Sequence, residues 1–250
     1  MNLLVTAGST QTPVDRVRCI TNAFVSRAGP AVARTAWGRG HAVTFVTSNP
    51  DALREFELNP RDPGERFSVL TYQTFDELAQ VLQNQLRIGG FDVVCQFASV
   101  GHFLAGGTFT PQAGTFFNAR NSQWESRSGP PTLAPQDAAK IDSAEPELWV
   151  RLVRAPKLVE RVRQPWGFGG LLVTFKLEAG VGEQDLVDAA EAARTQAAAD
   201  VTVATTLDGA SHWAYVGPIG GRYERFTRRE LPDRLVLALE DLYQQRAQHG

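Results

Sequence analysis

The chain has few cysteines and histidines, no long apolar run and no excess of either charge. Its two cysteines form no CxxC pair, and none of its four histidines is paired at i, i+4 with a carboxylate, so no zinc pattern is present. No stretch of about 18 consecutive apolar residues occurs, which argues against a transmembrane helix. The 25 basic and 27 acidic residues give a formal net charge of -2. We therefore expect no metal site, and neither nucleic acid nor membrane as a partner.

Several short motifs are also missing. Without GxGxxG or GxxxxGK[ST] the chain does not resemble a dehydrogenase or a P-loop protein, and it has no GxSxG or Ser/His/Asp layout. No basic segment precedes the first apolar run, so we expect no signal peptide, a cytoplasmic location and reduced thiols. Cys95 ends the apolar run Val93–Cys95, where a small buried hydrophobic side chain is expected rather than a nucleophile.

Apolar runs alternate with amphipathic segments along most of the chain, of which 43% is hydrophobic. This alternation predicts an α/β fold: one domain, residues 1–250, with a Rossmann-like, doubly wound, mostly parallel sheet. Strands are expected at 3–5, 42–47, 67–72, 91–98, 148–154, 171–177 and 201–204, and a hairpin at 212–226. Helices are expected at 31–37, 75–86, 157–163, 185–199 and 231–245, with a short helix and a loop at 51–66.

Residues 101–148 interrupt this pattern. They are rich in Gly, Pro, Ser and Thr and carry single aromatic residues, which argue against simple disorder. We expect an inserted arm here, either a lid or a small hairpin that packs on a partner subunit. An insertion without a role in chemistry is the alternative.

Ligands of such a sheet bind beyond the carboxyl ends of its strands. The first apolar run ends in Gly8, Ser9 and Thr10, whose hydroxyls and free N–H groups can hold an anion. The alternative is an ordinary strand-to-helix connection, which has a similar sequence. Phe175 can stack on a base and Lys176 can meet phosphates. Together with the other strand ends, 48–49, 98–102 and 205–206, these residues predict a mononucleotide pocket.

Six segments, taken together and in order, resemble the phosphopantothenate–cysteine ligase family over nearly the whole chain. The first runs from Val5 to Asn22, with Gly29 beyond it. The others are Ala98–Phe103, Lys140–Ser143, Pro156-Lys157, Thr174–Glu178 and Asp200–Ala204.

The resemblance implies a nucleotide-dependent ligase of coenzyme A biosynthesis that joins an acid to an amino acid. In this family 4′-phosphopantothenate attacks the α-phosphate of CTP or ATP, with Mg²⁺ on the phosphates. Cysteine then displaces the nucleotide from the acyl-nucleotide to form an amide. The resemblance also implies a homodimer in which the arm completes the neighbour's site. The flavin-binding decarboxylase often fused to this domain is absent, so no FMN is expected.

Site residues follow from the same resemblance. Asn22 is expected to contact the acyl intermediate, and Lys140 the triphosphate. Arg18 is expected to hold the pantothenate end or to order its loop. The remaining expected contacts to nucleotide or substrate are Gly8, Ser9, Thr10, Ala98, Ser99, His102, Phe175 and Lys176.

The chain also departs from the family pattern, and these departures leave other functions open. His102 replaces an Asp, Ser9 a Gly and Thr205 an Asn, and the Ser-Ser-Gly loop is Phe24-Val25-Ser26. Asp142, Ser143 and Ala197–Ala199 stand where basic residues are expected. The alternatives are a related ligase with another carboxylate substrate, and a catalytically silent homologue that binds a nucleotide.

Overall fold

The structure, a computed structural model, describes residues 1–59, 64–136 and 140–249. These residues form two compact units. Unit 1 comprises Met1–Thr10, Asn22–Val100 and Lys157–Gly250, and unit 2 comprises Gln11–Thr21 and Gly101–Pro156. Parts of the loop predicted at 51–66 and of the arm predicted at 101–148 fall on 60–63 and 137–139, outside the described residues. No described helix is long and apolar enough to cross a membrane.

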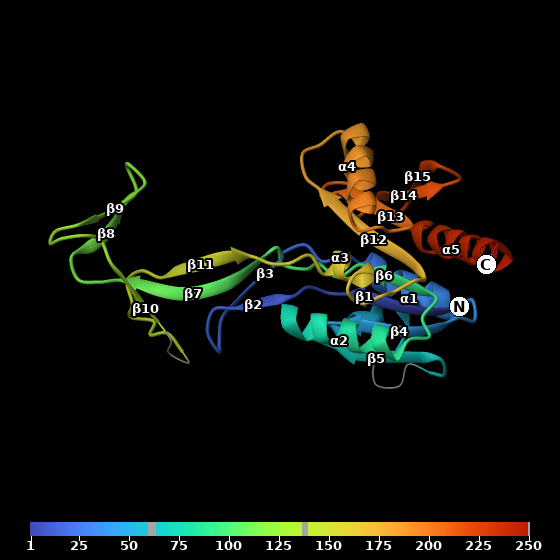
Figure 1. The fold of residues 1–250 in the computed structure, drawn as a ribbon, viewed down its shortest axis with the longest axis horizontal. Helices are drawn as coiled ribbons and strands as arrows, with labels where there is room; N and C mark the ends of the chain where they lie inside the picture. The colour runs from blue at the N-terminus through green and yellow to red at the C-terminus, as the bar shows by residue number, and fades with distance from the viewer. Residues whose placement is uncertain (60–63, 137–139, 250) are drawn as a thin grey trace. The chain divides into compact units, whose positions relative to one another are not determined.

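An eight-stranded sheet forms the centre of unit 1 (Figure 1), in the order β15-β14-β13-β12-β6-β1-β4-β5. The strands from β13 to β5 are parallel, and β14 and β15 are antiparallel. The chain moves from β1 to β5 and then returns to the other side of β1, so the strand order reverses between β1 and β6. This confirms the Rossmann-like, doubly wound sheet. Its strands are β1 (Asn2–Ala7), β4 (Ala42–Thr47), β5 (Phe67–Thr71), β6 (Val93–Gln96), β12 (Leu171–Glu178), β13 (Val201–Thr206), β14 (Trp213–Ile219) and β15 (Arg222–Thr227).

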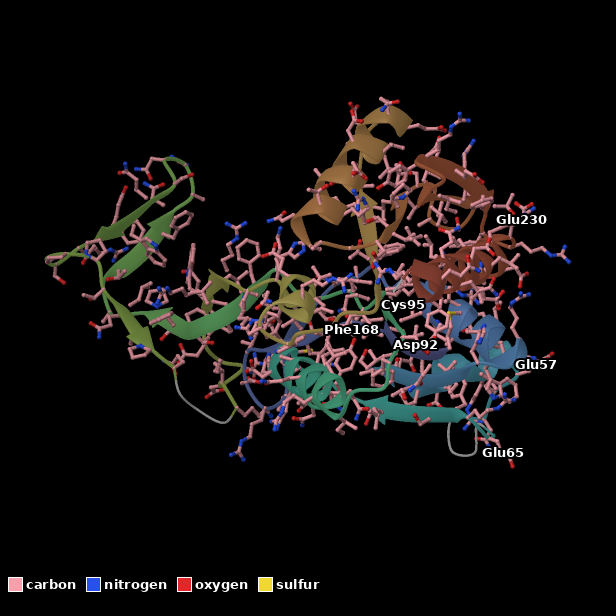
Figure 2. All side chains as sticks on the ribbon, turned by 45° about the vertical axis from the view of Figure 1, so that its right-hand side comes forward. Glu57, Glu65, Asp92, Cys95, Phe168 and Glu230 are labelled. Carbon is pink, nitrogen blue, oxygen red and sulfur yellow. The ribbon has the colours of Figure 1, made fainter. Side chains whose placement is uncertain are left out.

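Helices pack on both faces of this sheet. The buried residues of α1 (Ala28–Gly38) and α5 (Leu231–His249) share one core with the inner strands, and α4 (Glu183–Gln196) packs against the opposite face at Ala204. Cys95, labelled in Figure 2, lies fully buried in the first core, and burial raises the pKa of its thiol. The prediction of a small buried side chain at this position is therefore confirmed. The remaining helical segments are η1 (Pro50–Phe56), α2 (Phe75–Ile88) and α3 (Leu158–Arg163).

Helix α2 shows why the sequence predicted its position. Thr74 accepts a hydrogen bond from the N–H of Glu77, and the Glu77 carboxylate accepts one from the N–H of Thr74, so the two form a capping box. Leu78 and Leu82 lie fully buried on the inner face. Gly89 ends the helix with a φ of 79°, a backbone conformation that glycine adopts without strain.

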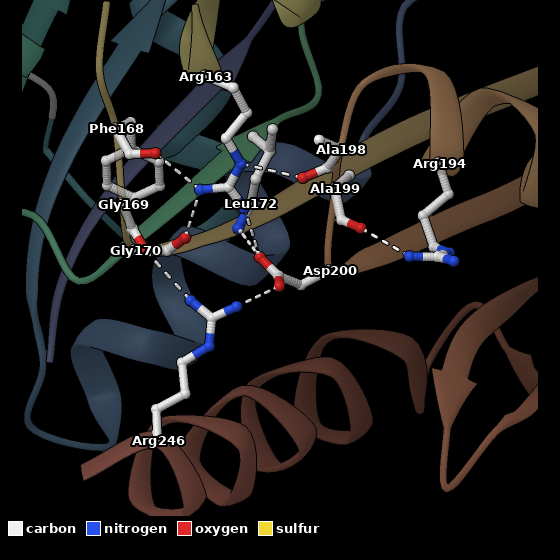
Figure 3. Close-up of polar contacts among 10 residues, drawn as sticks. All are labelled: Arg163, Phe168, Gly169, Gly170, Leu172, Arg194, Ala198, Ala199, Asp200 and Arg246. Atoms are coloured by element: carbon white, nitrogen blue, oxygen red, sulfur yellow. Dashed lines mark hydrogen bonds and ion pairs between the residues drawn. The ribbon is translucent and has the colours of Figure 1, made fainter. Parts of the chain in front are cut away.

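An ion-pair cluster joins elements at the amino ends of β12 and β13 (Figure 3). One oxygen of Asp200 accepts hydrogen bonds from the N–H of Leu172 (2.7 Å) and from Arg163 (2.8 Å), and the other binds Arg246. Because Arg163 lies on α3 and Arg246 on α5, one carboxylate ties two helices to the sheet. Arg163 also donates to the carbonyl oxygens of Phe168, Gly170 and Ala198.

Unit 2 is built from short antiparallel strands. Strands β2 (Gln11–Pro13) and β3 (Cys19–Thr21) pair, as do β8 (Thr115–Asn118) and β9 (Gln123–Ser126). Strand β7 (Phe103–Pro111) lies between β10 (Leu133–Pro135) and β11 (Trp149–Arg154). The rings of Phe117, Trp124 and Trp149 pack together with centroids 4.5–5.4 Å apart. Aromatic packing therefore orders a segment whose composition is typical of a loop.

The sequence pattern predicted β11 and allowed for a small hairpin in the arm, but it missed β2, β3, β7 and β10. The residues of β3 are all exposed, and the buried positions of β7 are Thr108 and Thr110. Neither strand shows apolar alternation, which is the signal for a half-buried strand. The alternative of an ordinary strand-to-helix connection after Thr10 does not hold, because the β2–β3 pair lies between β1 and α1.

Candidate functional site

The switch point between β1 and β6 is closed by backbone contacts. The N–H of Ser99 donates to Gly8 (2.8 Å), and the N–H of Thr10 donates to Ser99 (3.2 Å). The N–H of Ser9 donates to Ser48 Oγ (2.9 Å). Gly8 has a φ of +83°, and a Cβ atom there would lie 2.2 Å from Ser48 Oγ, so this turn requires glycine.

These contacts correct one expectation about the turn. The N–H groups of Ser9 and Thr10 were expected to be free for an anion, but both are used to join β1 to its neighbours. The small residues Ala98 and Ser99 do lie beside the turn, as the order of the strands predicted. The turn therefore lies at the carboxyl edge of the sheet, where the candidate site is expected.

Asn22 belongs to the same edge. Its Nδ2 donates a hydrogen bond to Ser99 Oγ (2.8 Å), and its side chain is exposed. The contact fixes an amide at the end of β6, close to the switch point. Sequence reasoning named both residues separately, and the structure brings them together.

Phe175 and Lys176 lie in the carboxyl half of β12, next to β6. The ring of Phe97, which is buried, meets the ring of Phe175 edge-on at 6.0 Å and an interplanar angle of 68°. The ring of Phe24 lies nearly parallel to Phe175, at 6.5 Å and 10°. Lys176 Nζ lies 2.8 Å from Glu178, so the lysine expected to meet phosphates is paired with a carboxylate.

A cavity of about 240 Å³ opens beside the turn, at the carboxyl ends of β1 and β4. Ser26 and Asn49 contribute to its lining, and Arg27 forms an ion pair with Glu55 on its wall. Sequence reasoning had selected Ser48-Asn49 but not Arg27 or Glu55, because no local pattern shows that residues so far apart in the chain will meet. The cavity adds a recess with both polar and apolar lining to the same edge of unit 1.

Arg18 and Lys140 lie in unit 2, where the Asp15 carboxylate contacts Arg18 and Ile141, the residue after Lys140. Asp15 accepts hydrogen bonds from Val17 N–H (2.8 Å), from the backbone and guanidinium of Arg18, and from Ile141 N–H (3.2 Å). Arg18 in turn donates to the carbonyl oxygen of Ile141. Ile141 is thus held through both its N–H and its C=O, which fixes the backbone next to the exposed Lys140.

The same contacts lower the pKa of Asp15 from 3.8 to about 2. The backbone N–H of Val17 has the largest effect, burial opposes it, and the N–H groups of Ile141 and Arg18 and the charge of Arg18 add to it. Asp15 was not among the predicted site residues, although Ile141 and its neighbour Lys140 were matched to the family motif.

Two of the residues that differ from the family pattern make hydrogen bonds that stabilise the fold. Thr205 Oγ1 donates to the carbonyl oxygen of Trp213 (2.8 Å), which joins β13 to β14. Ser26 Oγ accepts a hydrogen bond from Ala28 N–H (3.1 Å) at the start of α1. His102 is exposed, and its carbonyl oxygen accepts a hydrogen bond from Ala155 N–H. No group of three or more His, Cys, Asp or Glu residues within the described ranges is arranged to hold a metal ion.

Comparison with known proteins bears on this arrangement. Residues 1–106 match the family model described as the DNA/pantothenate metabolism flavoprotein C-terminal domain. The coenzyme A biosynthesis bifunctional protein CoaBC of Thermococcus kodakarensis is 29% identical over 247 residues, which cover 96% of this chain and 51% of that protein. The chain thus spans about half the length of this curated relative.

Three solved structures share the fold. The DNA/pantothenate metabolism flavoprotein of Streptococcus pneumoniae aligns with a TM-score of 0.72 and 22% identity, covering 97% of this chain and 99% of that one. The C-terminal domain of a CoaBC protein gives 0.64 and 17%, covering 98% and 96%. A Cab2 variant in complex with phosphopantothenate-cysteine gives 0.69 and 14%, covering 99% and 87%. The resemblance recognised in the sequence is thereby confirmed.

Proposed function

We propose that this relative of the phosphopantothenate–cysteine ligase domain is itself a ligase of coenzyme A biosynthesis. The observation that carries the proposal is the Asn22–Ser99 hydrogen bond at the switch point, where a doubly wound sheet binds its ligands. Support comes from the relative that matches 96% of the chain and from a fold neighbour that binds phosphopantothenate-cysteine.

The proposed reaction has two steps. The carboxylate of 4′-phosphopantothenate attacks the α-phosphate of CTP or ATP, the bond to the β-phosphate breaks, and pyrophosphate leaves. The amine of cysteine then attacks the acyl carbon, loses a proton to solvent, and displaces the nucleoside monophosphate to leave an amide. Mg²⁺ enters with the nucleotide, because this ion is held mainly by substrate phosphates and water.

The residues of the two units are assigned different tasks. Asn22 presents an amide donor to the acyl oxygen, where charge develops in both steps. Phe175 offers a ring face to the base, and Lys176 exchanges Glu178 for a phosphate oxygen. Arg18 orders its loop through Asp15 and the carbonyl oxygen of Ile141, and Lys140, the residue before Ile141, supplies positive charge for the triphosphate.

A pyrophosphate-release assay tests this function. Wild-type protein with CTP or ATP, Mg²⁺, 4′-phosphopantothenate and cysteine is expected to release pyrophosphate and form the amide. Asn22→Ala is expected to lower kcat by about 10²–10³-fold, the usual cost of one oxyanion donor. Gln83→Ala, on the exposed side of α2, is the matched control. If neither nucleotide yields pyrophosphate at high protein concentration, the proposal is wrong.

A second candidate is the same chemistry on another carboxylate substrate. Phe24 packs on Phe175 and Ser26 bonds to the backbone of α1, so the segment between Asn22 and α1 is an ordered apolar surface. Hydroxylamine traps an acyl-nucleotide as a hydroxamate, so a panel of carboxylic acids can be screened. A hydroxamate from another acid, and none from 4′-phosphopantothenate, would favour this candidate. Nucleotide binding without any hydroxamate would indicate a silent homologue.

We also propose that the chain acts as a homodimer through unit 2. Four large apolar side chains in the Gly101–Pro156 segment of this unit are at least one third exposed, which is unfavourable unless another surface covers them. They are Phe103 (53%), Phe116 (39%), Leu133 (36%) and Leu152 (46%). Light scattering during size-exclusion chromatography is expected to give twice the 27.3 kDa chain mass, and Leu152→Asp is expected to shift the mass toward the monomer.

A further inference from the structure

Phe24 is an aromatic residue in the segment that joins Asn22 to helix α1. It is only partly buried, and its ring faces that of Phe175 with 6.5 Å between centroids and 10° between ring planes. Nearly parallel rings at this distance are within the range of stacked aromatic pairs. The two residues are far apart in the chain, so the pairing is a product of the fold.

Both rings are held in place by their surroundings. Phe175 follows the buried part of β12 and packs edge-on against the buried Phe97. The segment that carries Phe24 is fixed at one end by the Asn22–Ser99 hydrogen bond and at the other by the bond from Ala28 N–H to Ser26 Oγ. Neither ring therefore needs a large movement to meet a flat ligand.

The polar groups around the pair suit a nucleotide. Ser99, which follows β6, accepts a hydrogen bond on its Oγ from the side-chain amide of Asn22. A planar base on the rings would leave its polar edge for this amide and hydroxyl.

We propose that Phe24 is a base-stacking residue, so that the nucleobase of the co-substrate stacks on a surface made by both Phe24 and Phe175. The proposal rests on the proposed function only for the identity of the ligand as a nucleotide. The competing explanation is that Phe24 merely buries apolar area against Phe175. The two explanations differ in what an aliphatic side chain at position 24 does to nucleotide affinity.

Equilibrium binding of CTP and ATP to the full chain, with Mg²⁺, tests this inference. Phe24→Ala and Phe24→Leu are both expected to weaken binding by about 5- to 150-fold, the range found for one base–aromatic stack. Phe24→Tyr is expected to bind like wild type. The control Gln83→Ala, on the exposed side of α2, is expected to leave affinity unchanged. Inorganic triphosphate, which has no base, is expected to bind all these variants equally.

The outcomes separate this inference from the proposed function. Loss of nucleotide affinity in Phe24→Ala and Phe24→Leu supports stacking, even if no pyrophosphate is ever released. Unchanged or tighter binding in Phe24→Ala overturns it, even if the wild-type protein is an active ligase. Wild-type affinity in Phe24→Leu overturns it as well, because apolar packing alone would then suffice. A wild-type protein that binds neither nucleotide refutes both.

Discussion

Replacement of Asp200 by alanine is expected to destabilise unit 1 without affecting its ligand edge. The Asp200 side chain is only 18% exposed, and it accepts hydrogen bonds from Leu172 N–H, Arg163 and Arg246. Alanine leaves the Leu172 N–H and the Arg163 guanidinium, which is 19% exposed, without their acceptor. Hydrogen bonds to a charged group contribute about 1.5–3 kcal/mol each when they are shielded from solvent.

The contribution of each partner differs with its exposure. Arg246 is 46% exposed, so its loss is expected to cost no more than about 1 kcal/mol. Arg163 keeps its three carbonyl partners, which reduces the cost of losing the carboxylate. We therefore expect Asp200→Ala to lower the free energy of unfolding by about 3–5 kcal/mol. Asp200→Asn retains an acceptor for Leu172 and is expected to lower it by about half as much.

Urea unfolding followed by tryptophan fluorescence measures these differences, with Arg246→Ala as the matched control. Because the cluster lies at the amino ends of β12 and β13, nucleotide affinity of the folded variants is expected to stay at the wild-type value. A loss below about 1 kcal/mol in Asp200→Ala would mean that the carboxylate contributes no more than a surface ion pair, contrary to this prediction.

Three further predictions concern single groups. The pKa of Asp15 is lowered to about 2, so its contribution to stability is complete above about pH 4 and is lost as the pH falls from there toward 2. Unfolding midpoints of Asp15→Asn between pH 5 and 2 are expected to lack that decline, and a parallel decline in both proteins would contradict the assignment. Gln96 is 6% exposed, and its amide has no hydrogen-bond partner among the described residues. Gln96→Met is expected to raise the free energy of unfolding by about 1–3 kcal/mol in urea, and a decrease would mean that the amide is satisfied. A thiol reagent is expected to modify the exposed Cys19 in the native protein and the buried Cys95 only after unfolding, and rapid modification of both would disprove this order.

The core strands of unit 1 could be predicted because their sequence signals are local. Strands β1, β6 and β12 are continuous apolar runs that end in small or polar residues, and such runs are typical of strands buried on both faces. Helix α2 carries its capping box and its terminal glycine in the sequence itself. The strand ends then indicated where Ser99 and Phe175 would lie.

The remaining features depend on contacts between distant residues. Thr108 and Thr110 are buried in unit 2, but threonine gives no apolar pattern in a sequence, so the residues of β7 were predicted to be a loop. The stacking of Phe24 on Phe175 could not be predicted, since a lone phenylalanine between Asn22 and α1 has no periodic partner. The hydrogen bond from Ile141 N–H to Asp15 also joins residues far apart in the chain, so it could not be predicted either.

The order of strands in unit 1 also has a consequence for synthesis of the chain. Strands β1, β4, β5 and β6 can pair as soon as they leave the ribosome, but the partner on the free side of β6 is β12. Residues 101–156 must be translated before β12 appears. During that interval β6 presents unpaired N–H and C=O groups and an apolar surface, the features that promote aggregation. Chains that stop before Leu171 are therefore expected to aggregate.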